Sequence, residues 1–169
     1  MNDVFGWFSP STIKAKILLQ KAWKERVGWD DPVPSSIYDA WFQWSTELPH
    51  LSEHISRCYF NEESQITLME LHGFCDAFEL THAAIIYLQP ITTQDNQVSL
   101  VISKTKAPPI KRLTIPHLEL CGACLLAQLH HVRQVLDIPL FQTFAWTDST
   151  IVLAWLDGSP RWFETFVGN

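Results

Sequence analysis

The stretch QTFAWTDSTIVLAWL, Gln142–Leu156, places one acid, Asp148, between two apolar runs. Ser149 and Thr150 follow this acid, and the second apolar run begins directly after them. Asp148 or Ser149 is suited to cap a helix that starts near Thr150, because a side-chain oxygen there accepts hydrogen bonds from free backbone N–H groups. The alternative is that Asp148 ends a strand at the carboxyl edge of an open α/β sheet, where such sheets build their sites. The stretch alone leaves both interpretations open.

The composition indicates a folded protein of one domain, or of one domain with an extension. The chain has 169 residues, of which 47% are hydrophobic and 18% charged, so it can bury a core. No apolar run reaches the ~18–20 residues of a membrane span, and the amino terminus lacks the pattern of a secretory signal. Four scattered cysteines are too few for a disulfide scaffold. We therefore expect an intracellular protein of the cytoplasm or nucleus, not secreted and without a membrane partner.

The formal net charge of −6 argues against a protein that simply coats nucleic acid. It does not exclude a nuclease, because a metal cluster needs carboxylates and brings its own positive charge.

Residues 1–64 have a helical pattern. The segment 11–27 predicts a helix that Ser11 caps after Pro10, and the segment 36–51 predicts a second amphipathic helix that stops before Pro49. We expect the tryptophans of this region to pack in the core and between the helices; they are Trp7, Trp23, Trp29, Trp41 and Trp44.

From Gln65 onward the apolar period shifts toward two. Strands are predicted over 65–78, 82–90, 98–106 and 138–148, with helices over 116–137 and 149–158 and a further helix beginning within 160–169. The long helix carries one apolar stripe, Leu118, Cys121, Leu125, Leu129, Val132 and Leu136. Short connections between the first three strands predict an antiparallel meander, and the long helix can return the fourth strand in parallel beside the first. The sequence therefore predicts an α/β (α+β) fold with a mixed sheet, preceded by a helical module.

This topology gathers three acids. Asp76, within or just after the first strand, comes to lie next to Asp148 at the end of the fourth, and Glu119 in the first turn of the long helix can lean toward both. Unpaired carboxylates held together are costly unless something cationic neutralises them. Divalent metal is the expected cation, because Mg²⁺ takes oxygen ligands and keeps several waters.

Several stretches are similar to one known family. GFCDA (73–77), SKTKAPPIKRLTIPHLELCGACLLA (103–127), WTDSTIVLAWL (146–156) and RWFETFVGN (161–169) resemble the ribonuclease-H-like part of BEL/Pao long-terminal-repeat retrotransposon polyproteins. FGWFSPSTIKAKILLQKAW (5–23), WDDPVP (29–34) and ELPHL (47–51) resemble the segment of the same polyproteins that follows the reverse-transcriptase palm. The resemblance covers nearly the whole chain, with the motifs in the family's order. It implies a connection-like segment over 1–64 and a ribonuclease-H-like domain over 65–169.

The resemblance also implies a site. Ribonuclease H folds hold two divalent ions, Mg²⁺ or Mn²⁺, with a D-E-D-D set of carboxylates, and Asp76, Glu119 and Asp148 match the first three. In the family such a site hydrolyses the RNA strand of an RNA–DNA hybrid. The implied partners are therefore that hybrid and the rest of the Pol polyprotein.

The sequence departs from the family pattern at its carboxyl end. The family's fourth carboxylate lies after a fifth strand, and residues 1–169 do not reach it. We accordingly expect a truncated fragment that lacks the last strand and helix and is inactive as given. The alternative is a non-catalytic remnant that at most binds nucleic acid.

The remaining motifs are weaker. An aspartic peptidase is a remote alternative, because TDST has Thr150 where Gly is needed and no second copy exists. Cys121 and Cys124 cannot close a four-ligand zinc site alone and are expected in the core. The segment 103–112 carries cations that belong either to a solvated connection or to an edge that contacts phosphates; they are Lys104, Lys106, Lys111 and Arg112.

Overall fold

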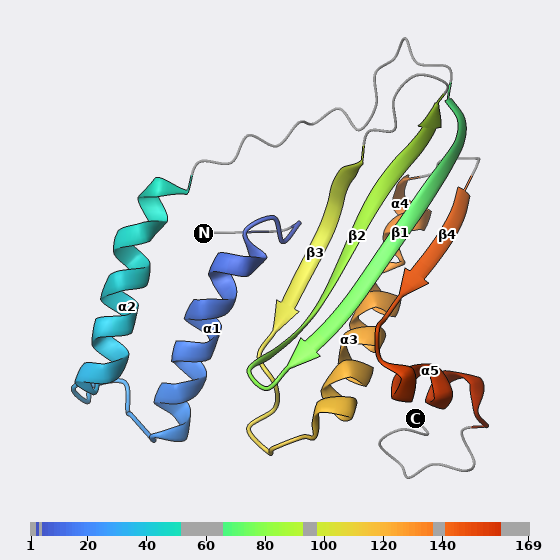
Figure 1. The fold of residues 1–169 in the computed structure, drawn as a ribbon. Helices are drawn as coiled ribbons and strands as arrows, with labels where there is room; N and C mark the ends of the chain where they lie inside the picture. The colour runs from blue at the N-terminus through green and yellow to red at the C-terminus, as the bar shows by residue number, and fades with distance from the viewer. Residues whose placement is uncertain (1–2, 4, 52–65, 93–97, 137–140, 160–169) are drawn as a thin grey trace.

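The computed structural model describes residues 3, 5–51, 66–92, 98–136 and 141–159 (Figure 1). Two helices and a short 3-10 turn come first: α1 (Ser9–Lys24), α2 (Ser35–Glu47) and η1 (Leu48–His50). The remaining elements are β1 (Ile66–Phe78), β2 (Thr81–Thr92), β3 (Ser99–Lys106), α3 (Ile115–Leu129), α4 (Val132–Leu136), β4 (Phe141–Trp146) and α5 (Thr150–Asp157).

The four strands form one mixed sheet of order β3-β2-β1-β4. β1 pairs with β2, and β2 with β3, in antiparallel fashion, whereas β4 pairs with β1 in parallel. This is the predicted meander with a parallel fourth strand, so the predicted fold class is confirmed. Figure 1 shows α3 behind one face of the sheet, where it connects the edge strand β3 to the other edge.

The core lies between α3 and the sheet. Leu71, Ile86 and Leu88 from the strands and Leu125 from α3 are almost fully buried in it. Gly73 lets the helix approach β1 closely, since a Cβ at this position would lie 2.6 Å from Cδ1 of Leu126. The period-two pattern of the strands therefore has its apolar side against α3. On the other side, called the open face below, Phe74 and Trp146 are 42% and 50% exposed among the described residues.

Several predicted helix details are wrong. α1 begins at Ser9 with Phe8 at the N-cap, so Ser11 does not cap it. The helix can include Pro10 because a missing N–H is tolerated in the first helical turn. The predicted helix over 116–137 is two helices, α3 and α4, separated at His130–His131.

The predictions for buried side chains hold only in part. Trp23, Trp29 and Trp41 are instead exposed by 56%, 96% and 47%. The two helices bury few side chains, and Ile37 is the only buried residue of α2. Trp44 does lie between the helices, and its indole N–H donates to the carbonyl of Ser11 at 2.9 Å. In α3, Cys121 is partly buried and Cys124 is exposed, whereas the leucines of the stripe are buried.

The amino-terminal segment covers the free edge of β3. The backbone N–H of Ser103 donates to the carbonyl of Phe5 at 2.8 Å, and the ammonium of Lys16 in α1 donates to the carbonyl of Thr105 at 2.8 Å. Gly6 permits this contact because its φ is +73° and a Cβ there would lie 1.6 Å from the carbonyl oxygen of Ser103. An otherwise unpaired sheet edge is thereby protected.

The predicted join at 61–64 and the predicted helix within 160–169 lie outside the described residues. The division at residue 64 stays a prediction.

Replacing Gly6 by Ala should detach the amino-terminal segment from β3. The Cβ would collide with backbone, and a non-glycine residue at positive φ adds strain of about 1–3 kcal/mol. We expect a lower melting temperature, measured by circular dichroism. Gly28→Ala is the matched control, because its Cβ would meet only the movable carboxylate of Asp31. Equal melting of Gly6→Ala and the unaltered chain would contradict this packing.

His82 in β2 should make stability depend on pH. It is buried, and its Nδ1 has no hydrogen-bond partner among the described residues. Burial lowers the pKa of the imidazole from 6.5, and the charge of Lys106 on the paired strand lowers it further. The unfolded chain therefore binds this proton more readily, so stability is lost as pH falls below about 6.5.

The slope due to His82 can reach about 1.4 kcal/mol per pH unit between its unfolded and folded pKa values. Denaturant unfolding at pH 7, 6 and 5 measures it. His82→Leu should flatten the dependence, whereas the exposed His131→Leu should not. An unchanged slope in His82→Leu would show that other groups carry the acid sensitivity.

Candidate metal centre

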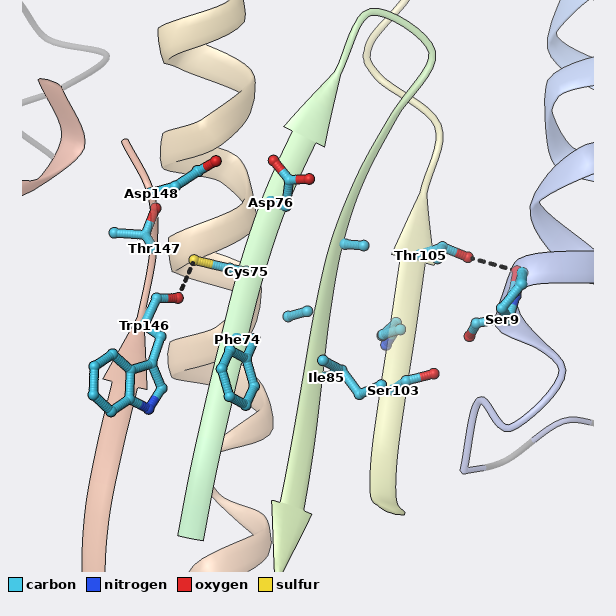
Figure 2. A pocket seen from close by; sticks show the side chains of 14 residues that line it. Ser9, Phe74, Cys75, Asp76, Ile85, Ser103, Thr105, Trp146, Thr147 and Asp148 are labelled. Carbon is cyan, nitrogen blue, oxygen red and sulfur yellow. Dashed lines mark hydrogen bonds between the residues drawn. The ribbon is translucent and has the colours of Figure 1, made fainter. Parts of the chain in front are cut away.

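Two of the predicted acids lie at the ends of neighbouring parallel strands. Phe74 of β1 is paired with Trp146 of β4. Asp76 lies two residues after Phe74, and Asp148 lies two residues after Trp146. Neighbouring strands are about 4.8 Å apart, so this register brings the two acids side by side. Figure 2 shows both carboxylates at the same end of the sheet, and both residues are exposed.

Asp76 and Asp148 line a cavity of about 550 Å³ on the open face of the sheet. The side chains of Phe74 and Trp146 lie below the acids along the same two strands (Figure 2). The opposite wall comes from β3 and from the start of α1, where Ser9 accepts a hydrogen bond from Thr105. The start of α1 therefore helps to shape the space beside the acids.

The buried thiol of Cys75 lies close enough to Asp76 and Asp148 for their charges to affect its pKa. This thiol lies 3.6 Å from the carbonyl oxygen of Trp146, to which it donates (Figure 2). Burial raises the pKa of the thiol, and the negative charges of Asp76 and Asp148 raise it further, against a hydrogen bond with Thr147. Both carboxylates thus act on one buried group between them.

The third predicted acid, Glu119, approaches the same edge from α3. It is partly buried and accepts a hydrogen bond from the hydroxyl of Ser149, the residue after Asp148. Gly122, one turn further along α3, helps this approach, because a Cβ there would already lie 3.2 Å from the carbonyl oxygen of Asp76. Ser149, not Asp148, caps α5, since its side chain accepts from the N–H of Val152.

The donor chemistry of these acids suits a hard divalent cation. In the described ranges neither Asp76 nor Asp148 forms an ion pair, and Asp76 accepts a hydrogen bond only from the N–H of Ala77, at 2.6 Å. Carboxylate oxygens are the ligands that Mg²⁺ prefers. Among the described residues, however, no group of three or more His, Cys, Asp or Glu side chains is already arranged around one metal position. Asp76 and Asp148 share the cavity, while Glu119 is held beside it by Ser149.

The predicted basic residues come from two parts of the fold. Lys104 and Lys106 belong to β3, within the predicted strand 98–106, while Lys111 and Arg112 lie in the loop before α3; all four are exposed. Arg112 lines a second cavity, of about 720 Å³, together with Lys24 of α1. Sequence analysis did not link Lys24 with Arg112, because nothing in the pattern indicated that α1 packs beside this loop.

An aromatic cluster on the open face was also not predicted. The rings of His72 and Phe144 stack with centroids 5.0 Å apart, and those of Phe74 and Trp146 stack at 6.4 Å. His72 also bonds to Glu70 at 3.0 Å, so it has a partner that the sequence did not suggest. The alternation of aromatic residues along both strands could have indicated this cluster.

The described elements define a ribonuclease-H-like fold: a β3-β2-β1-β4 sheet with one parallel edge strand and α3 packed on β1 and β2. The chain belongs to the family of Pao retrotransposon-like RNaseH-like domains, whose sequence model matches residues 1–149. This match includes both amino-terminal helices and the acids Asp76, Glu119 and Asp148. Family membership implies a setting of nucleic acid and retrotransposon polyprotein. No curated protein was found to match the chain.

Within the described ranges, no helix is both long and apolar enough to cross a membrane.

The pH dependence of Cys75 alkylation should show whether the charge of Asp148 lies near this thiol. In a variant that keeps only this cysteine, the pH midpoint for reaction with iodoacetamide should lie above that of a free thiol, because burial and both carboxylates oppose ionisation. Asp148→Asn should lower the midpoint, whereas Asp157→Asn at the far end of α5 should leave it unchanged. Identical midpoints in all three, measured in EDTA, would place Asp148 away from the thiol.

Proposed function

We propose that this domain binds divalent metal ions, Mg²⁺ or Mn²⁺, with Asp76, Asp148 and Glu119, and hydrolyses the RNA strand of an RNA–DNA hybrid. The observation that carries the proposal is the parallel register of β1 and β4, which brings two exposed acids without a cationic partner among the described residues to one cavity. The family match supports the choice of nucleic acid as the substrate class. Bound ions would activate a water molecule and stabilise the leaving oxygen of the phosphodiester.

The protein's own residues would position the ions and the substrate. Asp76 near the end of β1 and Asp148 just after β4 would offer oxygen ligands, and Glu119 would add a third carboxylate from α3. The cavity beside them offers room for the reacting phosphodiester and its neighbouring sugar, within the usual size of ligand sites.

The exposed cations would contact the backbone phosphates. Lys111 and Arg112 precede α3, and Lys104 and Lys106 project from β3. Such contacts position a nucleic acid without reading its sequence, and they weaken as salt rises. We further propose that the domain acts as part of the Pol polyprotein in the cytoplasm or nucleus, a setting supported by the free thiols of the cysteines that the structure describes, Cys75, Cys121 and Cys124.

Thermal melting with and without Mn²⁺ tests the metal site. A ligand that binds only the folded chain stabilises it by RT ln(1 + [L]/Kd), about 2.7 kcal/mol at a hundredfold excess over Kd. The melting temperature should therefore rise with Mn²⁺, and much less in Asp76→Asn and Asp148→Asn. Asp157→Asn, which changes the net charge equally, should respond like the unaltered chain.

Cleavage of a labelled RNA–DNA hybrid tests the reaction, with single-stranded RNA and double-stranded DNA as comparison substrates. We expect Mn²⁺-dependent cleavage of the RNA strand of the hybrid, which Asp148→Asn should abolish and Asp157→Asn should leave in place. Mn²⁺-dependent melting and hybrid binding without any cleavage would favour a nucleic-acid-binding role without turnover.

A further inference from the structure

The hydroxyl of Ser149 is hydrogen-bonded on both sides. It accepts from the N–H of Val152 at 3.2 Å, which caps α5, and it donates to Oε2 of Glu119 in α3. The backbone of Ser149 is held as well, because its N–H donates to the hydroxyl of Thr147 at 3.2 Å and its carbonyl accepts from Leu153 at 3.0 Å. Ser149 is 7% exposed, so water competes little for these bonds.

The direction of the bond to Glu119 is fixed by the cap. A hydroxyl has one proton and two acceptor positions. Val152 N–H is itself a donor, so it must use an acceptor position, and the hydroxyl proton is left for Glu119. A hydroxyl that donates to an ionised carboxylate forms a charge-assisted bond, which is stronger than a neutral one.

We propose that Ser149 is a positioning residue for Glu119: its capping hydroxyl holds the Glu119 carboxylate against the residue that follows Asp148, from where it would complete the metal ligands. This inference rests on the proposed function, because it assigns Ser149 a part in the same metal site. Without the bond, the long side chain of Glu119 would turn toward solvent, away from the like charges of Asp76 and Asp148. With it, Oε2 is anchored, and Oε1 would be the oxygen that ligates the metal.

The bond also couples two elements that are distant in sequence. α5 begins at Thr150, two residues after Asp148, and α3 carries Glu119. The side-chain oxygen that fixes the first turn of α5 therefore also fixes the ligand on α3. Groups that orient metal ligands typically change metal affinity by about 10–100-fold when they are removed.

The dissociation constant for Mn²⁺, measured by titration calorimetry on the 169-residue chain, tests this role. Ser149→Gly removes the hydroxyl but keeps a residue that tolerates the N-cap position, so Mn²⁺ should bind about 10–100-fold more weakly. Ser149→Thr restores a hydroxyl and should bind within a few-fold of the unaltered chain. Should the threonine variant not fold, Ser149→Asn replaces it, because its amide can accept from Val152 and donate to Glu119.

Two controls separate positioning from helix stability. Ala154→Gly weakens α5 at an exposed position and leaves the hydroxyl in place, so its Mn²⁺ affinity should be unchanged even where its melting temperature in EDTA falls. In the Glu119→Gln background, Ser149→Gly should cost little further affinity, since the two residues act through one contact.

The outcomes distinguish this inference from the proposal on which it rests. If Asp148→Asn abolishes Mn²⁺ binding while Ser149→Gly binds as tightly as the unaltered chain, the positioning role is wrong and the metal site stands. Equal losses in Ala154→Gly and Ser149→Gly would also overturn it, because a frayed α5 would then explain both. If the unaltered chain binds no Mn²⁺, the metal site and the role of Ser149 fail together.

Discussion

The parallel pairing of β4 with β1 is the constraint on which the site depends. Side chains alternate along strands, so a slip of one residue in this register would turn Asp148 toward the opposite face from Asp76. The observed pairing of Phe74 with Trp146 places Asp76 and Asp148 side by side at the same end of the sheet. The crossover that sets this pairing runs through α3, and Gly73 allows the helix to lie close against β1.

Two flanking contacts complete the surroundings of the acids. On one side, the cap of α5 at Ser149 links the end of β4 to Glu119. On the other, the segment from Phe5 to Ser9 is hydrogen-bonded to β3, and Ser9 and Pro10 form the far wall of the cavity together with β3. The start of α1 therefore contributes directly to the space next to the acids.

Sequence patterns predicted the order of the strands, the parallel return of β4 and the neighbourhood of Asp76 and Asp148. These features follow from alternation, connection length and the handedness of crossovers, which act locally or through simple topology. The burial of Trp23 and Trp29 was predicted wrongly, because an aromatic residue on an amphipathic helix is buried only where a second surface covers it. For the same reason, the sequence did not indicate that Lys24 and Arg112 line one cavity.

The placement of Glu119 was predictable only in part. Its position on α3 was predictable, but its hydrogen bond to Ser149 depends on where α5 begins, and the stretch around Asp148 left two candidates for that cap. Helix caps are decided by backbone geometry at a single residue, which sequence patterns locate only to within a few positions. The contact between a cap and a ligand from another helix needs the three-dimensional arrangement.

The central claim is that Asp76 and Asp148 hold divalent metal at the shared end of β1 and β4. A crystal structure of the domain grown with Mn²⁺, with an anomalous difference map at the manganese edge, tests it most directly. We predict a peak between the two carboxylates, with metal–oxygen distances of about 2.1 Å, and a ligand oxygen from Glu119. A map with no peak at this edge, or with manganese only at other acids, would contradict it.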